Sequence, residues 1–511
     1  MQVVSKIIKT IMDNVTETKQ QRIKDALAIL VGVFLVVAYA PFSFLPASII
    51  SLLGFLWLLQ NISPRRAAWR GFLFGLGLFG AGTSWVVISI HEFGHTPLPL
   101  ALFLTVLLTA YLSLFPALFA WLTVRYRLLE RPVLFMCVAP AVWAGTEWLR
   151  GTLFTGFPWL NIGYSQVDTW LSGYAPVVGV YGIGFLLMLS VAALFLLARN
   201  RKMPVVLLVA IWAGGWSLQS IEWATPAGDS LDVSLVQGNI SQLEKFRDEN
   251  RANTMSIYEE LTLENLDSDL IVWPETAIPA FYHQVADNYV ADIYRQAREN
   301  NGADLLFGVP MKQETADSER PRYYNSAVAL GKEFSVYHKR HLVPFGEVVP
   351  FGDLLRKIGG IFNVPLSDFS TGGLQAPLNL AGQKAAISIC YEIVFGEELA
   401  QTAGDATMLI NISNDAWFGD SLAPPQHFSM ARMRVKETAR PLLRATNTGI
   451  TAFVDYKAVV THQAPSFSVQ VLRGTIQPMQ GETLYVRYGN MPILLLIGFI
   501  LLISGFILRY R

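Results

Sequence analysis

The chain has 511 residues, of which 52% are hydrophobic and 15% are charged, and its formal net charge is zero. A composition this apolar excludes a single ordinary soluble domain, because lipid must cover part of the hydrophobic surface. The zero net charge and the lack of a basic strip argue against a nucleic-acid partner. We therefore expect a membrane protein that also carries a water-exposed part.

Long apolar runs rich in Leu, Val, Phe and Gly occupy the first 218 residues and the C-terminal end. A bilayer core takes about 20 helical residues, so such runs predict membrane-spanning helices. We expect eight spans, of which the second and seventh are short enough to be tilted, broken or re-entrant. Their approximate bounds are 26–44, 47–59, 71–90, 98–124, 133–149, 173–198, 203–218 and 492–508.

Basic residues predict how the spans are oriented. Lys and Arg gather before the first span, after the second, fourth and sixth, and at the C-terminus, whereas the other short connections have only Arg150 at an edge. Because positive charge stays on the cytoplasmic side, both termini are expected in the cytoplasm. The expected organisation is a cytoplasmic leader (1–24), a membrane domain with seven spans (25–220), an external catalytic domain (225–485), and an eighth span with a cytoplasmic tail (491–511).

The leader allows two interpretations. Its apolar residues recur at helical spacing between Lys6 and Lys9, which is typical of an interfacial helix. A loosely ordered, solvated end is the alternative. The first apolar run is long and lacks a small-residue cleavage site, so we expect a retained helix rather than a signal peptide.

The external region has the composition of a globular α/β domain. Strand-like runs alternate with helical stretches in an order typical of β-α-β units, and about 250 residues can bury one substantial core. The expected strands are 233–236, 270–273, 304–309, 326–330, 385–390, 408–412 and 450–454, and the expected helices are 253–265, 289–300 and 426–443.

Three reactive groups each follow a strand-like run in this domain: Glu275, Lys339 and Cys390. Strand ends converge in such folds, so the three side chains can meet. Their combination suits acyl transfer, with Cys390 as nucleophile and Glu275 as its base. Lys339, together with the backbone N–H of Tyr391, would stabilise the oxyanion of a tetrahedral intermediate.

Other residues near these motifs are candidates for supporting roles or substrate contacts. Glu347 and Glu392 can orient Lys339 or hold a second proton, and a structural ion pair is an equal alternative for each. Trp417 and Phe418 follow another strand end, where they can contact substrate or pack in the core. The remaining candidates are Asn325, Phe345 and Phe246.

Four motifs in order, Trp-Pro-Glu-Thr, Tyr-His-Lys-Arg-His-Leu-Val-Pro-Phe-Gly-Glu, Ile-Cys-Tyr-Glu and Asn-Asp-Ala-Trp-Phe, make the chain resemble the nitrilase superfamily. With the eight spans added, nearly the whole chain resembles the apolipoprotein N-acyltransferase family. The resemblance implies a four-layer αββα domain with the triad Glu275, Lys339 and Cys390. One departure is that Phe246 follows Lys245, where the family often has Trp, which concerns only a substrate contact.

The resemblance also implies a reaction and a location. A phospholipid, with phosphatidylethanolamine and its sn-1 chain expected, would acylate the α-amino group of a diacylglyceryl-cysteine on an apolipoprotein through a thioester on Cys390. No cofactor or metal is expected, and the chain is expected to act as a monomer. The expected location is the bacterial inner membrane, with the catalytic domain in the periplasm.

Two hydrophobic segments are candidates for guiding lipid to the thiol. Residues 343–364 are apolar and interrupted by glycines, which suggests a lid that touches the membrane, or else ordinary core packing. Residues 151–170 carry Phe154, Phe157, Trp159 and Tyr164, which suggests an aromatic interface belt or the wall of a lipid entry path.

Rival functions also deserve a test. His91, Glu92 and His95 match the His-Glu-x-x-His pattern of zinc peptidases, although Gly94 and the nearby prolines would break the helix that pattern needs. A closer rival is a membrane-tethered amidase or nitrilase that passes the acyl group to water, since the same triad serves both reactions.

Overall fold

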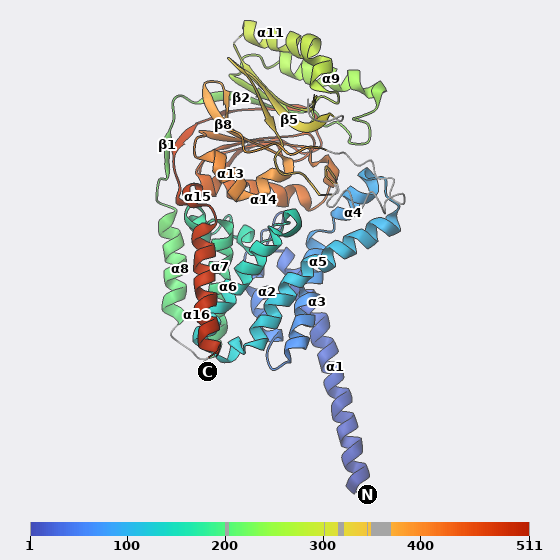
Figure 1. Ribbon diagram of the computed structural model, residues 1–511, viewed down its shortest axis with the longest axis vertical. Helices are drawn as coiled ribbons and strands as arrows, with labels where there is room; N and C mark the ends of the chain where they lie inside the picture. Colours follow the sequence, from blue (N-terminus) through green and yellow to red (C-terminus); the bar gives the residue numbers. More distant parts are fainter. Residues whose placement is uncertain are drawn as a thin grey trace.

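The computed structural model describes residues 2–199, 204–300, 302–314, 321–344, 346–348 and 369–509, with side chains from residue 19 onward. Phe345 and residues 349–364 of the expected lid lie outside the described residues. A bundle of helices forms the lower part of the molecule, and two sheets with flanking helices form the upper part (Figure 1).

Each of the eight expected spans contains a helix. Among the described residues, four helices are long and apolar enough to cross a membrane, or five if the pair Pro64–Gly82 and Val86–Phe93, bent by 62°, is one span. As expected, the second and seventh are short. The helices are α1 (Gln2–Val36), α2 (Pro46–Leu58), α3 (Pro64–Gly82), α4 (Val86–Ile88), η1 (Ser89–Phe93), α5 (Leu98–Arg125), α6 (Pro132–Arg150), α7 (Ala175–Leu197), α8 (Pro204–Leu218) and α16 (Met491–Arg509).

The first helix differs from the expected span. α1 runs without a break from the leader into the bundle, but it ends at Val36, eight residues before the expected end at Phe44. Pro41 explains the early end, because proline has no backbone N–H to donate and disfavours helix in the residue before it.

Glycines allow α3 to pack closely between α1 and α5. A Cβ added at Gly77 would lie 2.1 Å from the carbonyl oxygen of Ile29, and one at Gly75 would lie 2.6 Å from the Cα of Ser113. The run Gly75–Gly80, which mimics a dinucleotide-binding fingerprint, is therefore a helix-packing surface inside the bundle.

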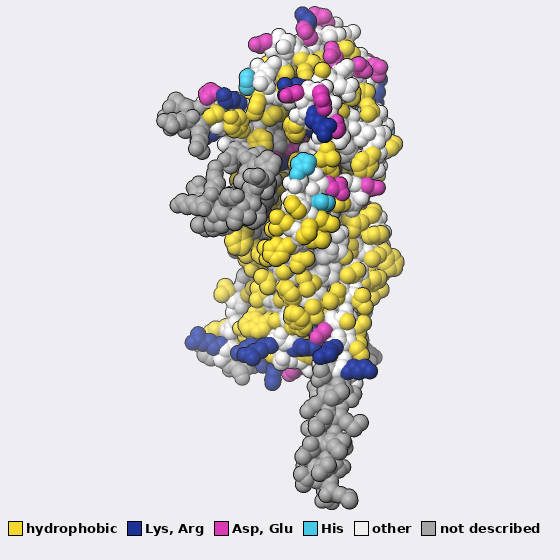
Figure 2. Space-filling view, turned by 90° about the vertical axis from the view of Figure 1, so that its right-hand side faces the viewer, with side chains coloured by type: hydrophobic (Ala, Val, Ile, Leu, Met, Phe, Trp, Pro, Cys, Tyr) yellow, Lys and Arg dark blue, Asp and Glu magenta, His cyan; other side chains and the backbone are white. Residues whose placement is uncertain are grey.

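On the face in view, Figure 2 shows a hydrophobic belt over the bundle, with Lys and Arg side chains gathered at its lower end. Exposed apolar side chains of the bundle helices include Phe103, Val106, Val209, Phe499 and Leu502. Large apolar side chains at such exposure need lipid around them. The chain is thus a membrane protein, and both of its ends lie at the basic end of the belt (Figure 1).

The upper part is a four-layer αββα sandwich, which confirms the expected fold. One six-stranded sheet has the order β13-β2-β3-β4-β5-β6 and the other β12-β11-β10-β9-β8-β7. An apolar core that includes Leu235, Val272, Ile387 and Ile410 fills the space between them. The strands are β2 (Leu231–Gln237), β3 (Leu270–Val272), β4 (Asp304–Gln313), β5 (Arg322–Leu330), β6 (Phe334–His338), β7 (Leu378–Leu380), β8 (Gln383–Ile389), β9 (Met408–Ser413), β10 (Leu442–Thr446), β11 (Ala452–Val454), β12 (Val460–Gln463) and β13 (Gln470–Ile476).

Helices cover the outer face of each sheet (Figure 1). α9 (Asp248–Leu263) and α11 (Ala291–Asn300) cover the sheet that contains β2, on the side away from the bundle. α13 (Gly396–Ala403) and α14 (Ala423–Thr438) cover the sheet that contains β8 and face the bundle.

The expected helix 426–443 is wrong at its end. α14 stops at Thr438, where Ala439 takes a left-handed conformation with φ 51°. Leu442 to Thr446 then form β10, which pairs in parallel with β9. The apolar and charged residues here fit either element by pattern, and pairing with a neighbouring strand decides between them.

The two parts share one hydrophobic core. Trp159 and Val180 of the membrane domain belong to the same buried cluster as Tyr391, Phe428 and Met433 of the sandwich. At the two ends of the sandwich, β1 (Ala224–Pro226) and β14 (Met479–Gly481) pair to form a two-stranded antiparallel sheet. After β14, α15 (Leu484–Tyr488) leads into α16. The sandwich is therefore packed against the bundle and not joined to it by a linker alone.

Candidate active site

The three predicted reactive residues follow the ends of three strands. Glu275 comes after β3, Lys339 directly after β6, and Cys390 directly after β8. β3 and β6 belong to one sheet and β8 to the other, so the residues approach one another from both sheets. All three are buried, with 6%, 1% and 7% of their surfaces exposed.

A hydrogen-bonded cluster surrounds the ammonium group of Lys339. Its Nζ lies 3.4 Å from Oε1 of Glu275 and 2.8 Å from Oε1 of Glu347. Asn325 Nδ2 donates to the same two oxygens, at 2.7 Å and 2.9 Å. Among the described residues, Lys339 thereby uses two of its three N–H bonds and keeps one for an incoming oxygen.

Glu275 is held at both carboxylate oxygens. Oε1 accepts the hydrogen bonds from Asn325 and Lys339. Oε2 accepts a hydrogen bond from the backbone N–H of Asn414, with 2.9 Å between nitrogen and oxygen. A carboxylate oxygen accepts two hydrogen bonds, so among the described residues Oε2 keeps a lone pair that can take a proton.

Electrostatics favour a charged lysine and a neutral thiol at rest. Burial works to lower the pKa of Lys339, but the carboxylates of Glu347 and Glu275 outweigh it and raise that pKa above its usual range. Burial raises the pKa of the Cys390 thiol, with Glu275 adding to the effect and Lys339 opposing it. A neutral thiol needs a base at the moment of attack, which is the chemistry expected of Glu275.

The backbone at Cys390 is strained. Its φ is 53°, a left-handed conformation that is uncommon for a residue with a side chain. A short helix, η7 (Cys390–Val394), begins at this residue. The first N–H groups of a helix have no partner within it, so the N–H of Tyr391 is placed as a candidate oxyanion donor beside the sulfur.

Comparison with known proteins decides the family. Residues 31–193 match the family model described as the apolipoprotein N-acyltransferase N-terminal domain, and residues 232–484 match the one described as carbon-nitrogen hydrolase. A protein from Methylococcus capsulatus named apolipoprotein N-acyltransferase is 44% identical over 91% of this chain and 92% of its own length. One of the same name from Nitrosomonas europaea is 45% identical, over 93% and 95%.

The chain belongs to the apolipoprotein N-acyltransferase family. It is therefore an acyltransferase with a nitrilase-like domain joined to a membrane domain, as the motifs predicted.

In this N-acyltransferase, Glu392 holds the nucleophile turn. Its carboxylate accepts hydrogen bonds from the backbone N–H groups of Ile389 (2.6 Å), His341 (3.0 Å) and Arg340, and from the hydroxyl of Tyr337 (3.1 Å). It therefore links the start of η7 to the segment that follows Lys339. This geometry makes Glu392 a support for the turn, while Glu347 is the carboxylate that pairs with Lys339.

Burial raises the pKa of Glu392 from 4.5 to about 7, against the lowering effect of those N–H groups. A carboxyl whose pKa is higher in the folded than in the unfolded state stabilises the fold fully below about pH 4.5, and this contribution is lost as pH rises through about 7. We expect the stability advantage of wild type over Glu392→Gln to shrink by on the order of 3 kcal/mol between pH 4.5 and 8.

Thermal unfolding of the two proteins in one detergent across that pH range measures the change. The matched control is Glu333→Gln, at an exposed glutamate of the same domain. A constant gap between wild type and Glu392→Gln would show that this carboxyl does not titrate in the window.

The other candidates lie in different places. Phe246 is 59% exposed beside Lys245, whose ammonium donates to the backbone carbonyl of Glu275 (3.3 Å). Trp417 is 39% exposed and meets Phe93 of η1 edge to face. Phe418 is half-buried and packs against the core that the two domains share.

The aromatic segment 151–170 divides between surface and interior. Phe154 and Trp170 are exposed, as an interface belt requires, but Trp159 and Tyr164 are buried beneath the sandwich. The hydroxyl of Tyr391 donates to the carbonyl of Gly156 in this segment (3.1 Å). The segment thus joins the membrane domain to the nucleophile turn, a role that its aromatic content alone did not indicate.

The zinc-peptidase pattern does not form the required geometry. η1 ends at Phe93, and His95 lies beyond it in a left-handed conformation with φ 49°. His91 Nδ1 instead lies 2.8 Å from the carbonyl oxygen of Thr96. The two imidazoles therefore do not share one helix face, which the zinc motif needs.

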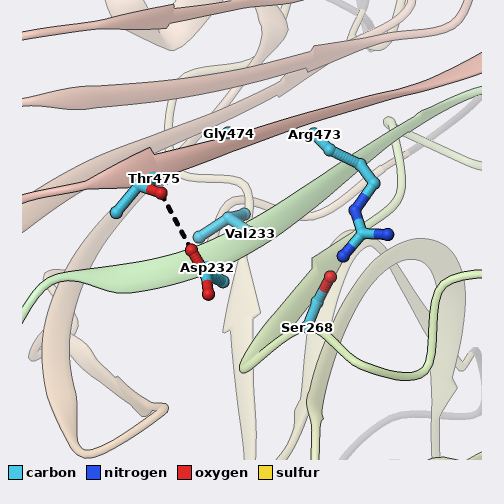
Figure 3. Close-up of a pocket in the computed structure, with 6 residues that line it drawn as sticks. All are labelled: Asp232, Val233, Ser268, Arg473, Gly474 and Thr475. Atoms are coloured by element: carbon cyan, nitrogen blue, oxygen red, sulfur yellow. Dashed lines mark hydrogen bonds between the residues drawn. The ribbon is translucent and has the colours of Figure 1, made fainter.

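One cavity in the described part of the chain lies elsewhere. It measures about 270 Å³ and is lined by Asp232, Val233, Ser268, Arg473, Gly474 and Thr475. Figure 3 shows these residues on β2, β13 and the segment before β3, with Thr475 donating to Asp232 (2.8 Å). The cavity adjoins the start of β2, whereas Glu275 and Cys390 lie beyond the ends of their strands, so it is separate from the candidate active site.

Proposed function

We propose that Cys390 takes an acyl chain from a phospholipid and passes it to the α-amino group of the diacylglyceryl-cysteine at the N-terminus of an apolipoprotein. The observation that carries this proposal is the buried arrangement of a thiol, a charged lysine and a carboxylate with a free lone pair. Phosphatidylethanolamine, cleaved at sn-1, is the expected donor. The names of the relatives supply the expected acceptor.

In the first half of the cycle, Sγ of Cys390 attacks the ester carbonyl while its proton passes to Oε2 of Glu275. The third N–H of Lys339 and the N–H of Tyr391 hold the oxyanion that forms. The C–O bond to the glycerol oxygen then breaks, and Glu275 returns the proton to that oxygen. The products are lysophospholipid and an acyl thioester on Cys390.

In the second half, the neutral amine of the acceptor attacks the thioester carbonyl. Glu275 takes a proton from the attacking nitrogen, the same donors hold the oxyanion, and the C–S bond breaks. Glu275 then reprotonates the sulfur, which leaves an amide product and the resting enzyme.

Lipid energetics support a site that opens toward the bilayer. Drawing a chain of about 15 methylenes into water would cost on the order of 12 kcal/mol, so the acyl tail must stay in contact with lipid. The helices that cover the β8 sheet face the bundle, and Cys390 follows β8 (Figure 1).

The location in the inner membrane, with the sandwich in the periplasm and both termini in the cytoplasm, is also proposed. It is supported by the positive charge at the end of the belt that carries both termini (Figures 1 and 2). Action as a monomer is a further part of the proposal.

Intact-protein mass spectrometry tests the cycle. The purified full chain is mixed with a defined phosphatidylethanolamine, then with a diacylated lipopeptide. We expect a gain of one acyl mass in the first step and its loss in the second, with N-acylated lipopeptide as product. Release of free fatty acid in place of the amide would favour the amidase alternative, and no adduct under single-turnover conditions would contradict the thioester.

A further inference from the structure

A buried histidine contacts the backbone of the nucleophile turn. His427, on α14, is fully buried, and its Nε2 lies 3.2 Å from the carbonyl oxygen of Cys390. That carbonyl belongs to the residue with the left-handed backbone. Glu275 and Lys339 instead form hydrogen bonds with each other and with Asn325 and Glu347.

The contacts of His427 indicate which nitrogen donates to the turn. Nδ1 lies 3.0 Å from Nη2 of Arg444, which can only donate, and 3.2 Å from Oδ1 of Asp415, which can only accept. Arg444 Nη2 also donates to Oδ2 of Asp415 (2.9 Å). Burial and the charge of Arg444 lower the pKa of His427, against the raising effect of Asp415. The carbonyl oxygen of Cys390 can only accept, so its contact with Nε2 places a proton on that nitrogen, and Nε2 donates to the carbonyl.

The ring is also held in place by packing. The Trp159 ring lies 5.7 Å from it and the Phe418 ring meets it edge to face at 6.2 Å. Trp159 is fixed in turn, because its Nε1 donates to Gln426, the residue before His427 (2.6 Å). Asp415 is anchored by the hydroxyl of Ser413 (2.7 Å). A ring restrained on its polar edge and on its faces defines a fixed direction for Nε2–H.

The Cys390 carbonyl and the Tyr391 N–H belong to the same planar peptide unit. Because the peptide is rigid and trans, fixing the direction of its C=O fixes the direction of its N–H on the opposite side. A donor on the carbonyl also polarises the unit and strengthens donation by that N–H.

We infer that His427 is a positioning residue that aims the oxyanion-binding N–H of Tyr391 through the carbonyl of Cys390. It touches neither the sulfur nor the substrate. This inference rests on the proposed role of Tyr391 N–H in acyl transfer. The buried group formed by His427, Asp415 and Arg444 is thus an extension of the active site into the junction with the membrane domain.

Two substitutions separate this role from plain packing. His427→Gln keeps an amide N–H at about the reach of Nε2, whereas His427→Asn is too short to reach the Cys390 carbonyl. Each full-length variant is tested with a p-nitrophenyl acyl ester in single turnover and with iodoacetamide. Acylation passes through an oxyanion, but alkylation of the thiol does not.

We expect His427→Asn to lose about 10²-fold in acylation rate, the effect of losing one oxyanion donor, while its alkylation rate stays within about 3-fold of wild type. His427→Gln should keep acylation within about 5-fold. The control His462→Asn, at an exposed histidine on β12, should change neither rate.

Equal acylation rates in the Asn and Gln variants would overturn the inference. A parallel loss of acylation and alkylation in both variants would also overturn it, because either result would make the role of His427 merely structural.

The p-nitrophenyl ester also separates this inference from the assignment of the acyl donor. Wild type that reacts with the ester but not with phospholipid would contradict the proposed donor and leave the role of His427 standing.

Discussion

Replacing Cys390 with serine is expected to abolish the acyl adduct and to lower N-acylation by at least about 10⁴-fold. A hydroxyl is a far weaker acid than a thiol, and the site already raises the pKa of the group at this position by burial. Glu275 therefore cannot activate a serine at the rate it activates the cysteine. Serine differs from cysteine by one atom, so the buried turn should keep its shape.

The measurement is adduct mass after exposure to phospholipid, together with the rate of lipopeptide acylation. Cys137→Ser is the matched control, because Cys137 lies in α6 of the membrane domain. This variant should form the acyl adduct and acylate the lipopeptide as wild type does. An acyl adduct on Cys390→Ser that forms at the wild-type rate would remove Cys390 from the mechanism.

Replacing Lys339 with methionine is expected to cost both activity and stability. Loss of the oxyanion cation should lower the acylation rate by about 10³-fold. It also leaves the buried Glu275 and the partly buried Glu347 without their shared positive partner, which should reduce the free energy of unfolding by about 3–5 kcal/mol. The two effects are measured by single-turnover acylation and by thermal unfolding.

A double variant separates the two effects. Lys339→Met combined with Glu347→Gln removes one of the uncompensated carboxylates, so part of the stability should return while the acylation rate stays low. Lys384→Met, at an exposed lysine on β8, should change neither quantity. Recovery of the acylation rate in the double variant would show that Lys339 serves only to neutralise Glu347.

The strands that carry Glu275 and Cys390 could be predicted because each is a short apolar run that ends at a polar turn. The same pattern located Lys339, although β6 is half-exposed and was not itself predicted as a strand. Spacing and motif order therefore indicated which residues would meet. They could not give the distances, since those depend on how two sheets pack face to face.

Other parts of the site carry no local pattern. Asn414 holds Glu275 with a backbone N–H, a group that every residue but proline possesses. His427 lies on a helix whose buried face includes many side chains of similar size, so its contact with Cys390 depends on the packing of α14 against η7. Trp159 lies in the segment expected to form an interface belt or the wall of a lipid entry path, but the sandwich covers it. Its hydrogen bond to Gln426 joins residues far apart in the sequence, which no local pattern predicts.

The shared core between the bundle and the sandwich fixes the position of the sulfur relative to the membrane helices. With Trp159, Val180, Phe428 and Met433 in one buried cluster, a tilt of the sandwich would have to break this packing. Under the proposed function, each substrate must therefore reach a sulfur at a set level. An acceptor peptide anchored by two fatty chains would reach that level only if its first residues were flexible, so a rigid fold placed directly after the lipidated cysteine would act as a barrier to modification.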